Sequence, residues 1–326
     1  MKLFQMHKNI NWCVSFFIVF TLLGASAADK YPSKPITVIS PFAAGGSADI
    51  MARFMAQKLT DSLGVPVIVE NKIGAGGGVG SNLVAKAKPD GYTLLLVTGG
   101  YPAQAALAKN SPFDPVKDIT MISMVTSYPF IIHVPIDSPF KNLNELIAKA
   151  KSNPGALNYA SSGIGSIHHL SSELMNVMAG IDTVHIPTKG GTGAMTELIG
   201  ERVDFLFEAP TLSLPFIKGG KVRALAVTTK ERLKYLPDVP TVAESIPGYE
   251  VRSFIGLGVT GGTPADIVKT LNTEVRAIID DKENAKRLAE LGGEPQSSSS
   301  EDMQVFVANE FHKWQRVIEM RKIERQ

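Results

Sequence analysis

The 326-residue chain contains only one cysteine, Cys13, which lies inside an apolar run near the N-terminus. A single cysteine cannot form an internal disulfide or supply the clustered thiolates of a structural zinc site. If Cys13 is removed with a leader segment, the mature chain has no thiol nucleophile either. The fold must then be stabilised by burial of an apolar core.

The apolar run near the N-terminus is too short to cross a membrane. It covers residues 12–23, whereas a transmembrane helix needs roughly 20 residues. Lys2 and Lys8 precede it, and small residues that end at Ala27 follow it, which is the pattern of a secretory signal peptide. We predict that residues 1–27 are removed by cleavage after Ala27 and that the protein is exported; a retained anchor is the alternative.

The sequence has no excess of either charge. It holds 33 Lys and Arg against 31 Asp and Glu, and removal of residues 1–27 deletes two basic residues and no acidic ones, leaving 31 of each. No basic stripe or charge block is present. The composition therefore argues against nucleic acid or a membrane surface as the partner.

Apolar runs rich in β-forming residues alternate with amphipathic stretches, which is typical of parallel strands covered by helices. The predicted strands form two series of four: 36–40, 67–70, 92–98 and 119–125, then 157–161, 183–187, 203–207 and 222–228. A fifth strand-like run follows each series, at 130–134 and 254–259. We therefore predict an α/β protein of two domains, each a mostly parallel five-stranded sheet flanked by helices, which exchange their fifth strands.

The exchange predicts two crossovers between the domains. They are expected near residues 127–128 and 248–252. Domain 1 then comprises 28–128 and 250–326, and domain 2 comprises 129–249. A chain that crosses twice forms a hinge, with a ligand cleft between the domains.

The C-terminal segment reads as two helices. Residues 265–291 are expected to form one long helix, and the serines at 297–300 can cap another. In that last helix an apolar stripe recurs at spacings of four, three and four, at Val307, Phe311, Trp314 and Ile318. We expect both helices to pack on domain 1, with Trp314 in the core.

Four glycine-containing loops follow predicted strands and precede predicted helices, at 41–49, 72–82, 161–169 and 187–195. In open parallel sheets, ligands bind beyond the carboxyl ends of the strands. We therefore expect these loops to line one cleft between the domains.

The loops do not match known catalytic or nucleotide motifs. The glycines of 72–82 lack the spacing of the dinucleotide fingerprint, and the chain has no Gly-Lys-Ser or Gly-Lys-Thr. Segment 45–49 lacks the final glycine of a nucleophile elbow. His168 and His169 would point about 100° apart on a helix, which makes a poor metal pair.

What remains is capture of an anion by main-chain N–H groups at helix starts. A carboxylate offers about four acceptor sites, which suits N–H groups from two helix starts together with serine hydroxyls. Gly45 and Gly46 fit this use, although a tight turn with positive φ would also explain them.

The segments "PFAAGGSAD", "VENKIGAGGGVGSNLVAKAKPDGYTLLL", "GIGSIHHL", "HIPTKGG", "VRALAVTT" and "LPDVPTVAES" resemble the periplasmic solute receptors of tripartite tricarboxylate transporters, also called Bug receptors. The resemblance is collinear over essentially the whole mature chain. It implies a two-domain periplasmic-binding-protein fold of the Venus flytrap, type II, kind. It also implies a monomeric, non-enzymatic protein without cofactor or metal, which closes on a small carboxylate, an organic acid or amino acid, and delivers it to membrane transporter subunits.

The resemblance also implies where the solute binds. The loop after the first strand and the Ser162–Ser166 loop would hold the carboxylate, partly through water. The predicted ligand-binding residues are Phe42, Ala43, Ala44, Gly45, Gly46, Ser47, Asp49, Gly76, Thr98, Ser162, Gly163, Gly165, Ser166, His169, Thr188, Lys189 and Glu208.

Four positions depart from the family pattern. Thr188 stands where the family often has Tyr, and Glu208 stands where it usually has Asp. Phe254 and Ile255 replace a Trp followed by an aromatic residue. The identity of the solute therefore cannot be copied from relatives.

Several of the site residues have a structural alternative. Ser47 could cap a helix, and Asp49 suits the first helical turn more than ammonium recognition. His169 could hydrogen-bond the loop in place of the solute. Lys189 could pair with a second carboxylate or remain solvated, whereas an ionised Glu208 would repel a second carboxylate and favour hydroxyl or ammonium groups.

Two other functions remain open at this point. One is a ligand-sensing receptor that docks on a sensor protein, whose binding site would look the same. The other is a secreted α/β hydrolase using Ser47 and His169, which the incomplete elbow disfavours.

Overall fold

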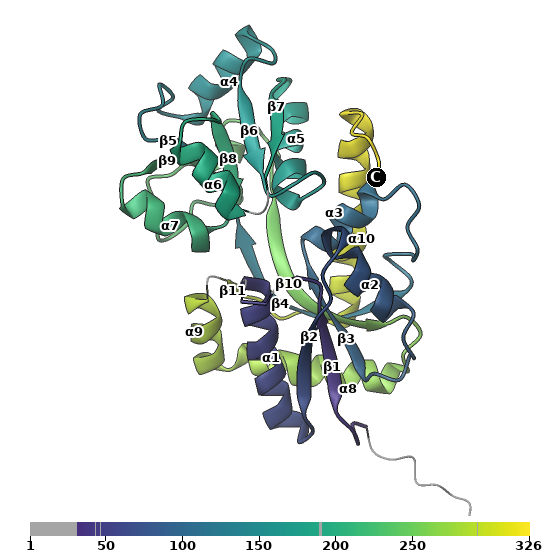
Figure 1. Ribbon diagram of the computed structural model, residues 1–326. Coiled ribbons are helices and arrows are strands. Elements are labelled where there is room, and N and C mark those ends of the chain that lie inside the picture. The colour runs from purple at the N-terminus through teal and green to yellow at the C-terminus, as the bar shows by residue number, and fades with distance from the viewer. Residues whose placement is uncertain (1–30, 43, 46, 189–190, 292) are drawn as a thin grey trace, which may run out of the picture.

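The computed structural model describes residues 31–42, 44–45, 47–188, 191–291 and 293–326. They form two lobes, each built on one mixed β-sheet (Figure 1). We call the six-stranded sheet with its helices the first lobe, and the five-stranded sheet with its helices the second lobe. The predicted signal peptide and its cleavage site lie outside the described residues.

The first sheet has the strand order β11-β4-β10-β3-β1-β2. Its strands are β1 (Ile36–Ser40), β2 (Val67–Asn71), β3 (Thr93–Thr98), β4 (Ile119–Pro129), β10 (Arg252–Thr260) and β11 (Glu294–Pro295). The helical segments of this lobe are α1 (Ser47–Leu63), η1 (Ala75–Gly77), α2 (Gly78–Ala85), α3 (Gly100–Leu107), α8 (Ala265–Asp280), α9 (Lys282–Glu290) and α10 (Ser300–Met320).

The second sheet has the strand order β7-β6-β8-β5-β9. Its strands are β5 (Ile131–Pro135), β6 (Asn158–Ser161), β7 (Val184–Pro187), β8 (Phe205–Glu208) and β9 (Val222–Val227). Its helical segments are α4 (Leu143–Ser152), α5 (Ile167–Ala179), α6 (Gly191–Ile199), α7 (Pro210–Lys218) and η2 (Val242–Glu244).

The exchange of fifth strands is confirmed, but the exchanged strands run against their neighbours. β5 pairs antiparallel with β8 and β9, and β10 pairs antiparallel with β3 and β4. Each exchanged strand enters its sheet from the other lobe, so it starts at the edge where the resident strands end. The two-residue strand β11 adds a sixth, also antiparallel, member to the first sheet, so the expectation of five strands was wrong there.

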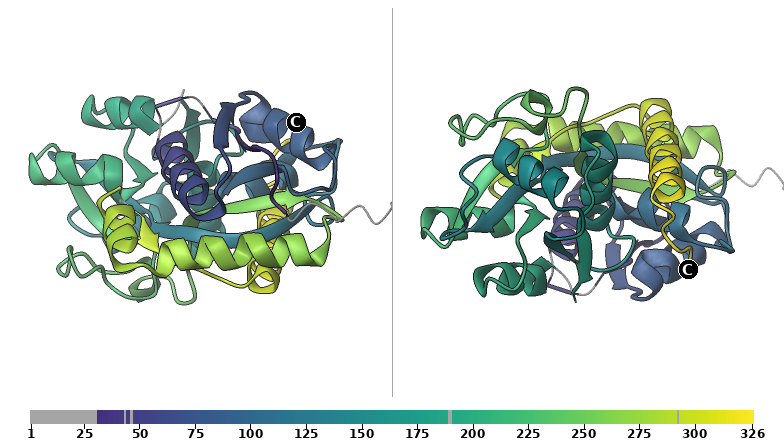
Figure 2. Two further views of the ribbon diagram at one scale, coloured as in Figure 1. Left: turned by 90° about the horizontal axis from the view of Figure 1, so that it is seen from below. Right: turned by 90° about the horizontal axis from the view of Figure 1, so that it is seen from above.

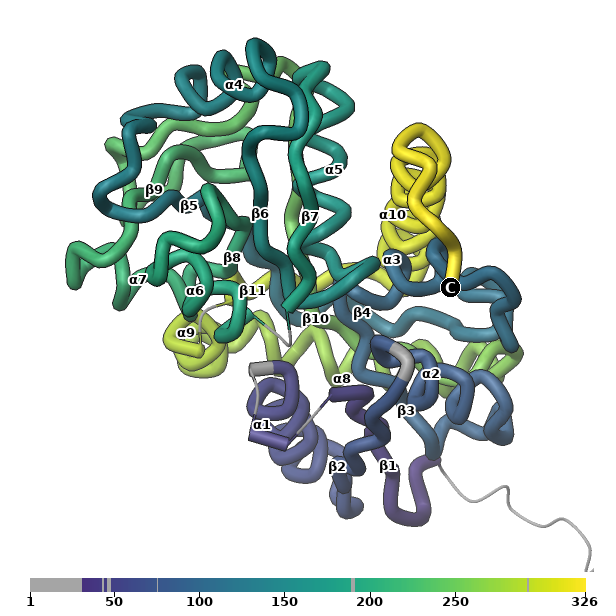
Figure 3. The backbone as a smooth tube through the Cα atoms, turned by 45° about the horizontal axis from the view of Figure 1, so that its top comes forward, coloured from purple at the N-terminus to yellow at the C-terminus, as the bar shows by residue number. Residues whose placement is uncertain are grey.

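A core lies between the first sheet and two of its helices. Val38, Leu94 and Leu257 from the sheet pack with Met55 of α1 and Leu271 of α8, and all five side chains are buried. Figure 2 shows α8 running along the sheet on this side. Apart from β11, the strands that are not exchanged end toward the junction of the lobes (Figure 3).

The predicted single helix at 265–291 is two helices. It breaks at Asp281, which has extended backbone angles (φ −67°, ψ 131°). The Asp281 side chain accepts hydrogen bonds from the main-chain N–H groups of Glu283, at 3.1 Å, and Asn284, at 2.9 Å. A side chain that satisfies these N–H groups starts a new helix, which the apolar pattern alone did not show.

The last helix, α10, packs on both lobes, whereas we expected it on domain 1 alone. Val307 belongs to a core of the first lobe. Trp314 and Ile318 belong instead to the large core that contains Tyr159 of the second lobe. Trp314 is fully buried, as predicted, but among residues of both lobes.

Candidate functional site

A cavity of about 700 Å³, which we call the interlobe cavity, lies between the lobes and is lined by residues of both. A second hollow of about 600 Å³, the side cavity, opens beside it along α2 and α3. Six residues line both spaces: Phe42, Gly76, Thr98, Gln104, Ser162 and Ser166. Five of these six were predicted as ligand-binding residues from the sequence; Gln104 was not.

The first-lobe wall begins with the loop after β1, which Asp49 holds in place. Asp49 is 2% exposed, and it accepts hydrogen bonds from Gly45 N at 2.9 Å, Arg53 Nε at 2.9 Å and Asn71 Nδ2 at 2.7 Å. Burial alone would raise the pKa of this carboxyl group, but the bonds from Arg53, Asn71 and Gly45 outweigh it and lower the pKa to about 2. These contacts favour a structural role for Asp49, which was the alternative to ligand binding in the sequence analysis.

This arrangement leaves fewer loop amides for a solute than we expected. The N–H of Gly45 is used by Asp49, and neither Gly45 nor Ala44 lines the two cavities. Ala43, Gly46 and the side chain of Ser47 lie outside the described residues. Phe42 remains from this loop, and its carbonyl oxygen accepts a hydrogen bond from Asn71 at 2.9 Å.

The two lobes approach each other closely at Gln104 of α3. Gly76 has φ 62°, a conformation that favours glycine, and a Cβ there would lie 2.5 Å from Gln104 Cδ and would force the Gln104 side chain to move. Gln104 Nε2 donates across the junction to the carbonyl oxygen of Ile164 at 3.5 Å. A Cβ on Gly165 would lie 2.3 Å from Leu107 Cδ2. Gly165 thus permits the contact between lobes and does not itself line the cavities.

The second-lobe wall is the loop that connects β6 to α5. Ser166 caps α5, because its Oγ accepts a hydrogen bond from His169 N at 3.2 Å. A hydroxyl that accepts in this way keeps its own hydrogen for another acceptor. Ser162 lines both cavities, whereas Gly163 lines the side cavity only.

The two adjacent histidines of α5 have different surroundings. His169 is 4% exposed, accepts a hydrogen bond at Nδ1 from Gly165 N at 3.0 Å, and stacks on His185 at 3.8 Å between ring centroids. Burial, with a contribution from Arg321, lowers the pKa of His169 to about 4, so it is neutral. It supports the loop and does not line either cavity.

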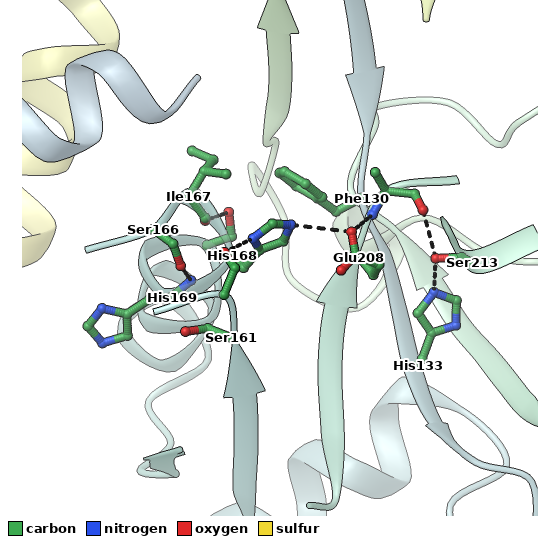
Figure 4. Close-up of polar contacts among 12 residues, drawn as sticks. Phe130, His133, Ser161, Ser166, Ile167, His168, His169, Glu208 and Ser213 are labelled. Atoms are coloured by element: carbon green, nitrogen blue, oxygen red, sulfur yellow. Dashed lines mark hydrogen bonds and ion pairs between the residues drawn. The ribbon is translucent and has the colours of Figure 1, made fainter. Parts of the chain in front are cut away.

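His168, which we did not select from the sequence, lines the interlobe cavity. Its Nδ1 lies 2.7 Å from Ser162 Oγ, and its Nε2 lies 3.5 Å from Glu208 Oε1. Figure 4 shows the ring of His168 directed toward Glu208, while the ring of His169 points away. Successive helix residues face different sides, so the sequence could have indicated that only one of the pair reaches the cavity.

Glu208 lies at the end of β8 and lines the interlobe cavity. It is 5% exposed; Oε1 accepts from Ala209 N at 2.8 Å, and Oε2 has no hydrogen-bond partner within the described part of the chain. Burial would raise the pKa of this carboxyl group, but His168, Ala209 N and His133 outweigh it and hold the pKa below its usual value.

The rest of the cavity wall is formed mainly by uncharged side chains. Tyr128, Thr211 and Ile255 are among its lining residues, and no Lys or Arg of the described residues lines it. Lys189 lies outside the described residues. Thr188 does not line the cavity, and its hydroxyl donates to Ser161 O at 2.8 Å.

Neither a metal cluster nor a membrane span is found in the described ranges. No three His, Cys, Asp or Glu side chains there are grouped so that they could hold a metal ion. None of the helices in these ranges has the length and apolar character needed to cross a membrane.

A family model described as "Tripartite tricarboxylate transporter family receptor" matches residues 51–323. The chain belongs to this family. Protein BugT from Bordetella pertussis is 34% identical over 295 residues, which cover 90% of this chain and 90% of BugT. The chain is thus a periplasmic solute-binding receptor, and the hydrolase alternative is rejected because such receptors are not enzymes.

Solved structures with bound acids share the fold. The structure titled "R. palustris Rpa4515 with adipate" has a TM-score of 0.78 and 34% identity, covering 89% of this chain and 97% of that chain. MatC from Rhodopseudomonas palustris with bound malate has a TM-score of 0.75 and 32% identity, covering 88% of this chain and 100% of that chain. The two-domain periplasmic-binding-protein fold is therefore established for this chain.

Proposed function

We propose that this receptor captures a small carboxylate in the interlobe cavity and delivers it to a membrane transporter. The observation that carries the proposal is that both lobes bring hydroxyl groups at strand ends and helix starts to one space. Thr98 comes from the first lobe, and Ser162 and Ser166 come from the second. The relatives crystallised with adipate and malate support a carboxylate as the solute.

Closure of the lobes is proposed as the signal that the transporter reads. The chain crosses between the sheets at β4–β5 and again before β10. We accordingly keep the domain boundaries predicted above, 28–128 with 250–326 and 129–249. A solute shifts the receptor to the closed form only if it contacts both lobes there. The transporter as partner is implied by the family.

We also propose that the mature receptor starts after Ala27 in the periplasm. Mass spectrometry of protein secreted by a Gram-negative host should show an N-terminus at residue 28. A mass that includes residues 1–27 would contradict this.

The carboxylate site is tested by Ser166→Asp. Aspartate is as good a helix cap as serine, so α5 should remain folded, while the added charge repels a bound carboxylate. We expect adipate or malate at about 100 times its Kd to stabilise the wild type by about 2.7 kcal/mol in a thermal-shift assay, and to leave Ser166→Asp unshifted.

The matched control is Asn142→Asp. Asn142 caps α4 in the same lobe and accepts from Glu145 N at 3.0 Å, and it does not line either cavity. This variant gains the same charge at a helix start and should respond to the acid like the wild type. An equal response of Ser166→Asp and the wild type would contradict the site.

A further inference from the structure

The side cavity, about 600 Å³ in volume, adjoins the interlobe cavity at the six residues that line both spaces. Thr98, Ser162 and Ser166 are among these six, and they are the hydroxyl residues proposed above to hold the carboxylate. A solute bound there through its carboxylate can therefore extend in either of two directions. The chemistry of the two walls decides which direction the rest of the solute takes.

The interlobe cavity carries a negative charge in its wall at Glu208, which does not line the side cavity. Glu208 is ionised at neutral pH, since its pKa lies below the usual value. A second carboxylate of the solute would be repelled there, because the two groups have the same charge and neither can donate a hydrogen bond. An apolar tail would remove water from Glu208 without replacing the lost hydrogen bonds. Neither group is therefore favoured in this direction.

The wall of the side cavity consists mainly of apolar side chains and glycines. Leu96 of β3, Tyr101 and Leu107 of α3, and Phe113 of the loop that follows all line it. The rings of Tyr101 and Phe113 stack, with 6.1 Å between their centroids. Within the described ranges, no Asp, Glu, Lys or Arg lines this cavity. A hydrocarbon group gains free energy by leaving water for such a surface.

Several polar groups of this wall already have partners within the protein. Tyr101 Oη donates to the carbonyl oxygen of Pro115 at 2.8 Å, and Ser81 Oγ donates to that of Gly77 at 2.9 Å. The N–H groups at the first turn of α2 are used in the same way, since Val79 N donates to a carbonyl oxygen of the preceding loop at 3.4 Å. Side-chain amides also line the cavity, but a neutral amide does not balance the charge of a second carboxylate.

Both lobes contribute an accessible aliphatic side chain to the side cavity. Val79 of α2 is 49% exposed, and Ile164 of the loop between β6 and α5 is 44% exposed. A tail that covers both side chains buries apolar surface of both lobes at once. Such a tail favours the closed form, because contacts to both lobes are what a solute needs to shift the receptor toward closure.

We propose that the solute is a monocarboxylate with an apolar tail, whose carboxylate is held at Thr98, Ser162 and Ser166 while the tail lies in the side cavity. Val79 and Ile164 are then specificity-determining residues, because they contact the tail and not the carboxylate. The inference rests on the proposed function, since it uses the carboxylate site proposed there, and it names the class of solute.

The test is isothermal titration calorimetry of butyrate, pentanoate, hexanoate and adipate at pH 7.5. Carboxylic acids have a pKa of about 4, so all four are ionised at this pH. Each methylene that leaves water for an apolar wall strengthens binding by up to about fourfold. We expect the affinity to rise from butyrate to hexanoate in steps of this size. Hexanoate should also bind more tightly than adipate, which has the same number of carbon atoms and a second carboxylate.

Val79→Ser makes the wall of the side cavity more polar without touching the interlobe cavity. The side chain is half-exposed, so the variant should remain folded. The ratio of the affinities for hexanoate and butyrate should fall by about fivefold, because the longer tail covers more of this wall. Ala105→Phe, on α3, is the second variant. Ala105 lines the side cavity only, and a phenyl ring there should lower the same ratio by occupying the space of the tail.

The matched control is Val305→Ser, which replaces a 60% exposed valine of α10 that lines neither cavity. It should keep the ratio of the wild type. Equal affinities for butyrate and hexanoate would overturn the inference, and so would tighter binding of adipate than of hexanoate or an unchanged ratio in both Val79→Ser and Ala105→Phe. Failure of all these acids and of malate to bind would instead overturn the proposed function, and the inference with it.

Discussion

Asp49 and Glu208 are both buried acids with lowered pKa values; Asp49 lies behind the first-lobe wall of the interlobe cavity, and Glu208 lies in the second-lobe wall. Both oxygens of Asp49 accept hydrogen bonds, including two from Arg53 and one from Asn71. Glu208 uses one oxygen, and its Oε2 has no partner in the described part of the chain. Asp49 therefore holds a loop in place, whereas Glu208 keeps a partly unpaired negative charge beside His168.

The largest effect on stability is expected from Asp49→Asn. The amide replaces an acceptor by a donor that faces the donors of Arg53, Asn71 or Gly45. Loss of charged hydrogen bonds in a buried site should lower the free energy of unfolding by about 2–3 kcal/mol, measured by urea denaturation.

Asp61→Asn is the matched control for this change. Asp61 is an exposed acid of the same helix, and its Oδ1 accepts from Gln57 Nε2 at 3.0 Å. Its replacement should change the free energy of unfolding by less than about 0.5 kcal/mol. Equal losses in the two variants would show that Asp49 does not hold the loop.

The loss of stability in acid reports on the same Asp49 carboxylate and is expected to be of similar size. Folding lowers the pKa of Asp49 to about 2, below the roughly 4 of an unfolded chain. The stabilisation by Asp49 is therefore fully present above about pH 4 and is lost as the pH falls through 2. A shift of this size contributes on the order of 2.6 kcal/mol.

Urea denaturation of the wild type and Asp49→Asn between pH 6 and pH 2 measures this contribution. The difference in their free energies of unfolding should narrow as the pH falls. A constant difference over this range would mean that the Asp49 carboxylate is not selectively stabilised in the folded state.

The sequence predicted the strands more closely than the helix ends. Strand β1 occupies the residues expected for it, because Pro35 and Pro41 bound the apolar run and so fix where the strand can begin and end. The break at Asp281 was missed, since an apolar stripe can continue past a capping residue. The position of Trp314 between both lobes depends on how the lobes pack, which no local pattern encodes.

The sequence predicted which loops form the candidate site better than which side chains line it. The loops after β1 and β6 do reach the interlobe cavity, because strand ends in such sheets meet there. His168 was missed since α5 begins two residues after Gly165, and the sequence does not fix which of two adjacent histidines faces the cavity. The use of the Gly45 amide by Asp49 requires coordinates, because it depends on how the loop folds back.

A smaller effect on stability than that of Asp49→Asn is expected from Glu208→Gln. The replacement keeps an acceptor for Ala209 N and removes a buried charge that is only partly satisfied. The gain from burying less charge and the cost of an unpaired amide should nearly cancel, leaving the free energy of unfolding within about 1 kcal/mol of the wild type. Adipate should nevertheless bind more tightly, because the replacement removes from the wall of the interlobe cavity a negative charge that repels a carboxylate.

Calorimetry at pH 7.5 should therefore show a higher affinity for adipate in Glu208→Gln than in the wild type. Glu301→Gln, at an exposed position in the first turn of α10, is the matched control and should alter neither stability nor this affinity. A loss of stability as large as that of Asp49→Asn would mean that Glu208 is also part of the wall's framework. The contrast between a satisfied and a partly satisfied acid would then no longer distinguish the two sides of the cavity.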